Sequence, residues 1–223
     1  PILISDEITM KNRNNPEWIP GFIFDVSEGQ GKERMEAGAN KERENTTYWS
    51  AMALLSSNTH VMDYLSGART HSSEGEMRRL LEKKLTTVIQ WDNGDTQIIN
   101  RIKTNYGVAG ALYVQYLVDN QDTVLRIIKE VHAHLKVEFE FTDDERYWHA
   151  GCTALIAGGV LAGKKYANIV DIPLAGAIAV LKEIVKDSRT IIKQNVRTAE
   201  DVLNAYVREN YGKFVVIKAL DGA

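Results

Sequence analysis

The chain opens with a short hydrophobic segment that ends in two acids. Residues 1–4 are apolar, and Asp6 and Glu7 follow after a single serine. A short continuous apolar run is typical of a strand buried in a parallel sheet, and open α/β folds bind ligands at the carboxyl ends of such strands. We therefore expect both carboxylates at that edge of a sheet. An ordinary strand followed by a solvated acidic turn has the same pattern, and it remains an alternative.

A second apolar segment begins at Trp49 and ends in the polar residues Ser56, Ser57 and Asn58. It predicts a second buried strand beside the first, with the Asn58 amide at the same edge, where it can both donate and accept a hydrogen bond. The alternative is that Asn58 only begins a turn. Between the two segments, residues 16–26 predict a helix, and the charged stretch up to residue 47 predicts an exposed loop.

The second half of the chain has apolar positions at helical spacing. This spacing predicts a short amphipathic helix around 98–102 and longer helices over 122–136, 142–164 and 173–194. The segment 142–145 has the form of a capping box, as does 73–76. A last helix over 198–210 and a terminal strand over 214–217 complete the prediction, and residues 85–91 are a candidate for a further strand.

Composition narrows the class of protein. Of the 223 residues, 44% are hydrophobic and 26% are charged, and the formal net charge is −3, so we expect a globular protein that does not coat nucleic acid by bulk electrostatics. The single cysteine, Cys152, lies among apolar residues, which predicts a buried, unreactive thiol in a reducing compartment. No signal peptide or membrane-spanning run is apparent, so the expected location is the cytoplasm and no membrane partner is expected.

Several short motifs occur in a fixed order over the first third of the chain. They are the acidic pair at 6–7, Gly-Gln-Gly-Lys-Glu-Arg at 29–34, Trp49, the polar strand end at 56–58, and Gly-Glu-Met-Arg-Arg at 75–79. This order resembles the carboxyl-terminal half of the P-loop ATPase domain in phage and prophage helicase-like proteins, the family described as superfamily II helicase and inactivated derivatives, which is related in outline to primase-helicases. The Asn-Tyr-Gly-Val-Ala-Gly segment at 105–110 resembles the segment directly after that domain in the same family.

The resemblance implies a fold and a division of the chain. It implies an α/β fold, with residues 1–92 forming part of a RecA-like or AAA+-like P-loop ATPase sheet and residues 93–223 forming a mostly helical domain with a short terminal strand. The sequence contains no G-x-x-x-x-G-K-[ST] loop, so the amino-terminal half that binds the phosphates is expected outside these residues. Hydrolysis by these residues alone is not expected.

The resemblance also implies roles for particular residues. Asp6 would lie near Mg²⁺, Glu7 would act as the base, and Asn58 would sense the γ-phosphate of ATP. Arg79, or Arg78, would reach the nucleotide of a neighbouring subunit in a homo-oligomeric ring. The cations at Lys32 and Arg34 would contact phosphate or a nucleic-acid backbone.

The implied function is that of a phage or prophage DNA helicase or primase-helicase, which couples hydrolysis of Mg-ATP to unwinding and binds DNA, expected to be single-stranded. Two alternatives stay open. One is a non-catalytic interaction module with a degenerate ATPase fold, and the other is a DNA-packaging motor that shares the acid chemistry. A phosphate-binding loop upstream of Pro1 would support the motor, and its absence would support the module.

Overall fold

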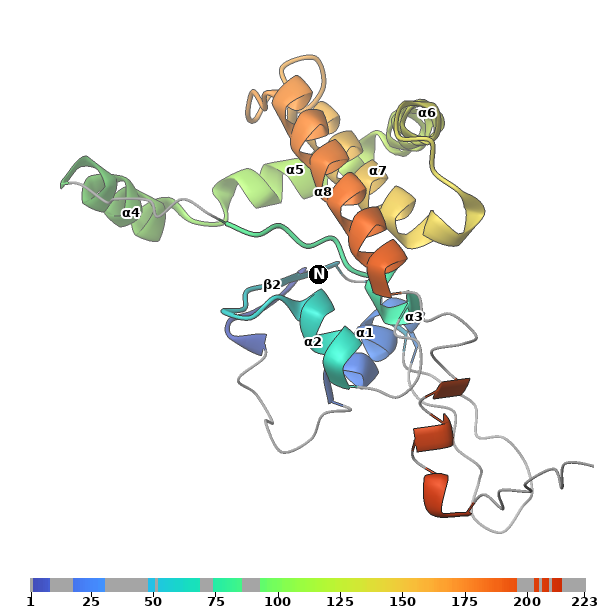
Figure 1. The fold of residues 1–223 in the computed structure, drawn as a ribbon. Helices are drawn as coiled ribbons and strands as arrows, with labels where there is room; N and C mark the ends of the chain where they lie inside the picture. The colour runs from blue at the N-terminus through green and yellow to red at the C-terminus, as the bar shows by residue number, and fades with distance from the viewer. Residues whose placement is uncertain are drawn as a thin grey trace, which may run out of the picture.

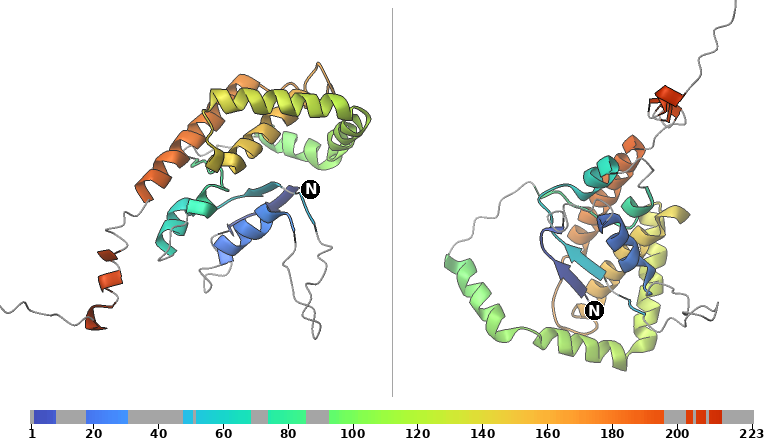
Figure 2. Two further views of the ribbon diagram at one scale, coloured as in Figure 1. Left: turned by 90° about the vertical axis from the view of Figure 1, so that its right-hand side faces the viewer. Right: turned by 90° about the horizontal axis from the view of Figure 1, so that it is seen from below.

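A computed structural model gives the fold of most of the chain, and helices dominate the part that it describes (Figure 1). Seen from the side, two layers are apparent: one holds α6, α7 and α8, and the other holds the strands with α1 and α2 (Figure 2). The described residues are 2–8, 18–30, 48–50, 52–68, 74–85, 93–195, 203–204, 206–208 and 210–213.

The two predicted strands pair with each other in parallel. β1 (Ile2–Ser5) lies beside β2 (Met52–Leu55), with Ile2 opposite Met52 and Ser5 opposite Leu55. The prediction that these segments are neighbouring parallel strands is therefore confirmed. The prediction that they are buried is wrong, because Ile4 is 73% exposed and Leu54 is 63% exposed.

The predicted fold class is also wrong. Within the described residues the sheet has only two strands, and it is not the sheet of a RecA-like or AAA+-like P-loop ATPase. A short apolar run predicts a strand, but it carries no information on how many other strands the chain supplies. Most of the described chain instead follows helical spacing, so the described fold is mainly α-helical. Of the candidate strand at 85–91 only Leu85 is described, and it is not in a strand; residues 86–91 and the terminal strand at 214–217 lie outside the described residues.

Three helices accompany the sheet. α1 (Trp18–Glu28) forms where the sequence predicts a helix, α2 (Val61–Ala68) follows β2, and α3 (Glu74–Met77) is a single turn. α3 contacts α1, α2 and α8, so this one turn joins the sheet-bearing layer to the helical layer. Its two buried residues, Glu76 and Met77, face that junction.

An arm formed by α4 (Asn93–Asn105) and α5 (Val108–Asp119) extends from the body (Figure 1). Gly107 separates the two helices and has φ 84°, a left-handed conformation that glycine adopts without the steric cost of a Cβ atom. α5 returns the chain to α6, against which it packs. α4 stands away from the body, and its described side chains, from residue 96 to residue 105, are all exposed.

The helical layer consists of α6 (Gln121–Glu138), α7 (Arg146–Ala162) and α8 (Leu174–Asn195), with α7 in contact with both others. These helices lie where the apolar spacing predicts them. The capping box at Thr142 is confirmed: the Thr142 amide donates to Glu145 Oε2 at 3.1 Å, and the 3₁₀ turn η2 (Asp143–Glu145) leads into α7. Farther on, residues 203–204 and 206–208 are helical and a 3₁₀ turn, η3 (Tyr211–Lys213), follows.

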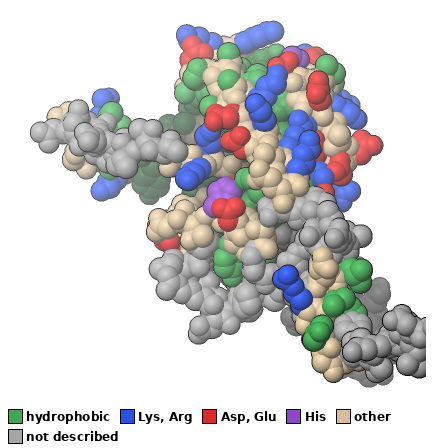
Figure 3. Space-filling model, in the orientation of Figure 1, with side chains coloured by type: hydrophobic (Ala, Val, Ile, Leu, Met, Phe, Trp, Pro, Cys, Tyr) green, Lys and Arg blue, Asp and Glu red, His purple; other side chains and the backbone are tan. Residues whose placement is uncertain are grey.

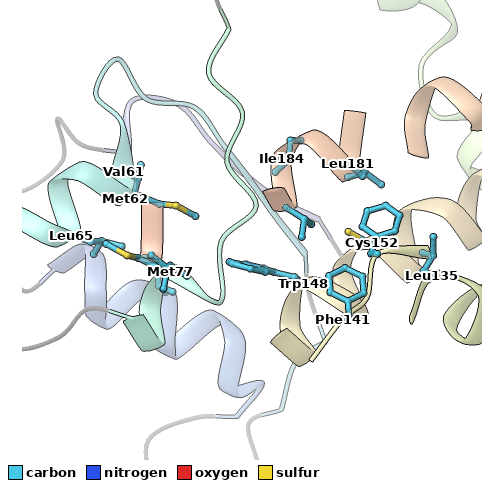
Figure 4. Packing of buried hydrophobic residues seen from close by; sticks show 14 of the residues in the cluster. Val61, Met62, Leu65, Met77, Leu135, Phe141, Trp148, Cys152, Leu181 and Ile184 are labelled. Carbon is cyan, nitrogen blue, oxygen red and sulfur yellow. The ribbon is translucent and has the colours of Figure 1, made fainter. Parts of the chain in front are cut away.

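The main hydrophobic core crosses the predicted boundary at residue 92. Figure 4 shows Trp148 between Met77 and the α2 side chains on one side and Phe141 with the α8 side chains on the other. Trp148 has no solvent exposure, and neither has Leu135 or Cys152. The two layers are therefore joined by one continuous core.

Charged side chains of both signs alternate over the helical layer, and none gathers into a large single-sign patch on the face that Figure 3 shows. This distribution agrees with the small net charge of −3. Among the described helices, none combines the length and the apolar character that a bilayer crossing requires.

Candidate functional site

The candidate site lies at the carboxyl ends of β1 and β2, where the structure brings the acidic pair beside Ser56. The Ser56 hydroxyl donates to Asp6 Oδ1, and the backbone N–H of Glu7 donates to Ser56 Oγ at 3.4 Å. The ladder continues past the strands, because the Ser56 amide donates to the Ser5 carbonyl at 3.1 Å. One serine thus holds both acids at the edge where parallel sheets bind ligands.

Glu7 has an unusual backbone conformation, with φ 53°. A residue with a Cβ atom in this left-handed region is strained by roughly 1–2 kcal/mol. The next residue explains why the strain is tolerated, since Ile8 is buried and its amide donates to the Ser56 carbonyl at 3.0 Å. Glu7 Oε2 is buried and accepts no hydrogen bond from any described residue. Strain together with an unsatisfied carboxylate oxygen is typical of a functional position.

Asn58 makes no described contact with the acidic pair. It is exposed, and no hydrogen bond links it to Asp6 or Glu7 within the part of the chain that the structure describes. The chain turns away after Ser56: Ser57 Oγ donates to the Thr59 carbonyl at 2.7 Å and accepts from the Thr59 amide at 3.1 Å. Ser56 therefore makes the hydrogen bonds to the acids, and the role of Asn58 as a sensor stays a prediction. The register could have shown the place of Ser56, because Ser56 follows Leu55 just as Asp6 follows Ser5.

Glu82 is a further residue near this edge that the sequence argument missed. Its carboxylate accepts hydrogen bonds from the first two amides of α2, Val61 at 2.7 Å and Met62 at 3.1 Å. His60 Nε2 lies 3.4 Å from the same carboxylate. Glu82 lies about twenty residues from the helix that it caps, so no local sequence signal identifies it.

Arg79 lies between two aromatic rings. Its guanidinium carbon is 4.3 Å from the Phe24 ring centroid and 4.6 Å from that of Tyr147, a distance at which cation–π attraction operates. Its Nε donates to Ser27 Oγ at 2.9 Å and its NH1 to the Gly75 carbonyl at 2.6 Å. This arrangement, the Arg79 sandwich, ties α1 and α3 to α7, so the contacts favour a role inside the chain over one in a neighbouring subunit.

Arg78 is also engaged within the chain. Its NH2 lies 2.6 Å from Glu74 Oε1 and 2.6 Å from Asp144 Oδ2. The second contact links α3 to the turn before α7, parallel to the Arg79 sandwich. Action of either arginine on another subunit would require it to leave these partners. The two other predicted cations, Lys32 and Arg34, lie outside the described residues.

The oxygen atoms at this edge suit a hard divalent cation. Carboxylate and hydroxyl oxygens are the ligands that Mg²⁺ takes from proteins, usually one or two carboxylates with water and substrate phosphates completing the shell. Asp6, Glu7 and Ser56 offer such atoms, which is fewer than an all-protein metal cage needs. In agreement, the described residues contain no group of three or more His, Cys, Asp or Glu side chains able to hold a metal ion.

No family model matches this chain, and no curated protein or solved structure matches it significantly. A function must therefore be inferred from the chain's own residues.

Proposed function

We propose that this chain supplies the acidic edge of a magnesium-dependent, ATP-hydrolysing site in a DNA helicase or primase-helicase of the phage type. The observation that carries the proposal is the meeting of Asp6, Glu7 and Ser56 at the carboxyl ends of two parallel strands. The order of motifs over residues 1–81 supports it independently.

The three side chains would divide the work. Asp6 would orient the water shell of Mg²⁺, and Ser56 would hold the Asp6 carboxylate in one rotamer through its hydroxyl. Glu7 has one carboxylate oxygen with no described partner, so it is the better placed of the two acids to accept a proton from an attacking water. When bound, Mg²⁺ would neutralise charge that develops on the phosphates.

Other parts of the proposed activity require contacts beyond the acidic edge. A phosphate-binding loop must be supplied by another segment or subunit, since the sequence holds no G-x-x-x-x-G-K-[ST]. Lys32 and Arg34 would contact phosphate or the backbone of single-stranded DNA. With a net charge of −3, binding to DNA would depend on such local cations and would weaken as salt rises.

The test is nucleotide turnover by the complete protein with Mg²⁺, with and without single-stranded DNA. Glu7→Gln keeps the size of the side chain and removes its basicity, so we expect a loss of about 10²-fold or more in turnover. Asp187→Asn, a matched change of an exposed acid on α8, should leave turnover unchanged. Equal turnover by wild type and Glu7→Gln would remove this edge from the reaction.

A non-catalytic interaction module is the second candidate, and the engagement of both arginines within the chain favours it. Arg79 and Arg78 hold α3 against the start of α7, which is a structural role. Either arginine would have to break these contacts to reach the nucleotide of a neighbouring subunit. The same assay separates the two candidates. A module would show no Mg²⁺-dependent turnover in the complete protein, and Glu7→Gln would have no effect on DNA binding or assembly.

A further inference from the structure

The arm of α4 and α5 carries far more apolar surface than a solvated helix pair needs. Monomeric proteins rarely leave large apolar patches uncovered. A helix as short as α4 is also marginal in water by itself, because nucleation is costly and packing supplies most helical stability in proteins. The exposed large apolar residues of the arm are Ile98, Ile99, Ile102, Tyr106, Val108, Leu112, Val114 and Val118.

On α4 these residues form one stripe. Ile98 and Ile102 are four positions apart and Ile99 is three from Ile102, so all three share a face of the helix. Arg101 and Lys103 flank the stripe on its two sides, and neither has an ion-pair partner among the described residues. The arm therefore presents an apolar ridge edged with positive charge.

The sheet presents a second uncovered surface with the opposite charge at its end. The parallel register places Ile4 opposite Leu54, and Met52 lies two residues before Leu54, so all three point to one face. They are 73%, 63% and 39% exposed in the order Ile4, Leu54, Met52. Asp6, two residues after Ile4 and exposed, lies at the carboxyl end of the same face. Parallel sheets almost always have helices on both faces, and no helix among the described residues covers this one.

We propose that α4 of one copy of this chain covers the sheet face of a second copy. A helix is the element that covers a parallel sheet, and α4 has an unpacked apolar face that could do so. Its flanking Arg101 and Lys103 would approach the acidic end of the face.

The contact would be heterologous, because the arm and the sheet face are different surfaces of the same chain. Head-to-tail contacts of this kind repeat, and they close into a ring or continue as a filament. The proposal explains why α4 projects away from its own body in Figure 1. It needs no nucleotide, so it goes beyond the proposed ATPase and does not depend on it.

Cysteine cross-linking between two differently tagged chains tests the contact. One chain carries Ile102→Cys on the arm and the other carries Leu54→Cys on the sheet face. The natural thiol of Cys152 is buried and does not interfere. After mixing without nucleotide and adding a short bismaleimide, we expect a covalent dimer that contains both tags. Asn100→Cys, on the opposite side of α4, is the matched control and should give about tenfold less product.

A second test measures self-association without cross-linking. Ile98→Asp with Ile102→Asp places two charges in the proposed contact, and it should weaken self-association by about 100-fold or more in sedimentation equilibrium. Asn100→Asp should leave self-association unchanged. Both variants remain folded if their circular dichroism and unfolding midpoints match the wild type, as expected for positions that are exposed in the single chain.

Three outcomes would overturn the proposal. A single chain carrying both cysteines that links only to itself would show that the arm covers its own sheet. Equal cross-linking by Ile102→Cys and Asn100→Cys would show that the stripe makes no specific contact. A monomeric wild type whose α4 variants lose only binding to anionic lipid vesicles would assign the stripe to a membrane surface. None of these results bears on turnover by Glu7, so the two proposals fail separately.

Discussion

The core between α6, α7 and α8 and the two-stranded sheet bury their apolar residues to very different extents. In the helical layer Leu135 has no exposure and Val185 only 1%, whereas in the sheet Ile4 and Leu54 are mostly exposed. A helix satisfies its own backbone hydrogen bonds and needs only one covered stripe, which neighbouring helices supply. A parallel sheet needs further strands at its edges and helices on both faces. Within the described residues, neighbouring helices thus cover the stripe of each core helix, whereas the sheet has two strands and an exposed face.

The same substitution in the two layers would measure this difference most directly. Leu135→Ala removes a fully buried side chain between α6 and its neighbours, so we expect the free energy of unfolding to fall by about 2–5 kcal/mol. Leu54→Ala, at a largely exposed position of β2, should cost less than about 1 kcal/mol. Urea unfolding of both variants gives the two values. Equal losses in protein dilute enough to be monomeric would mean that the chain itself covers the sheet face.

The next largest effect on the free energy of unfolding is expected from an ion pair inside the helical layer. Arg189 on α8 makes two hydrogen bonds of 2.7 Å to the buried carboxylate of Glu145, and its NH2 also donates to the Phe139 carbonyl at 2.9 Å. Arg189→Met would leave the Glu145 charge buried without its partner, and we expect a loss of about 2 kcal/mol in unfolding free energy. Arg126→Met, which removes an exposed pair with Glu130, should cause no measurable change.

The pH dependence of stability gives a second measure of the same pair. Burial by itself would raise the pKa of Glu145, but the hydrogen bonds from Arg189 and the Thr142 amide, with the Arg189 charge, hold the pKa below its ordinary value. The pair therefore stabilises the fold above the pKa of an unfolded glutamate, about 4.3, and the stabilisation is lost as the pH falls below that value toward the folded pKa. Stability of Arg189→Met should fall less steeply than that of the wild type as the pH drops below about 4.3, the pKa of an unfolded glutamate. A slope equal to that of the wild type would contradict this account.

A smaller effect is expected at the junction of the layers, in the Arg79 sandwich. Lysine keeps the charge of Arg79, but it cannot stack between Phe24 and Tyr147 and also donate in two directions. We expect Arg79→Lys to lower the unfolding free energy by about 1 kcal/mol. Arg101→Lys, on the exposed arm, is the matched control and should have no effect on a monomer. Unchanged stability of Arg79→Lys would remove the sandwich as a structural link.

The sequence predicted the helical layer well because its signals are local. The apolar spacing on α6, α7 and α8 and the capping box at Thr142 all act within a few residues of each other. The pairing of β1 with β2 was also predictable, since both are apolar runs that end in polar residues. The fold class was not, because the number of strands in a sheet depends on segments far apart in the chain.

The candidate site shows the same limit. Asp6 and Glu7 were identified from the end of a single strand, but the hydrogen bonds that Ser56 makes to them were not foreseen, because they depend on the register of the second strand. The sequence cannot show that Arg79 lies between aromatic rings from α1 and α7, which are far apart along the chain. A motif fixes which residue types are present, whereas packing decides which of them meet.

Thiol labelling compares the two layers without a measurement of stability. Cys152 is the thiol of the helical layer, and a cysteine introduced at position 54 is the thiol of the sheet. Burial raises the pKa of the Cys152 thiol to about 11, and the side chain has no solvent exposure, so neither a thiolate nor access is available at pH 8. The native wild type should therefore not react with a thiol reagent until urea unfolds it, at which point one thiol per chain should appear. A cysteine at position 54, from Leu54→Cys, should react at once in dilute protein and more slowly as concentration rises, if a second copy covers that face. Rapid labelling of Cys152 in the folded wild type would mean that the helical layer opens far more often than its packing implies, and the contrast between the layers would then disappear.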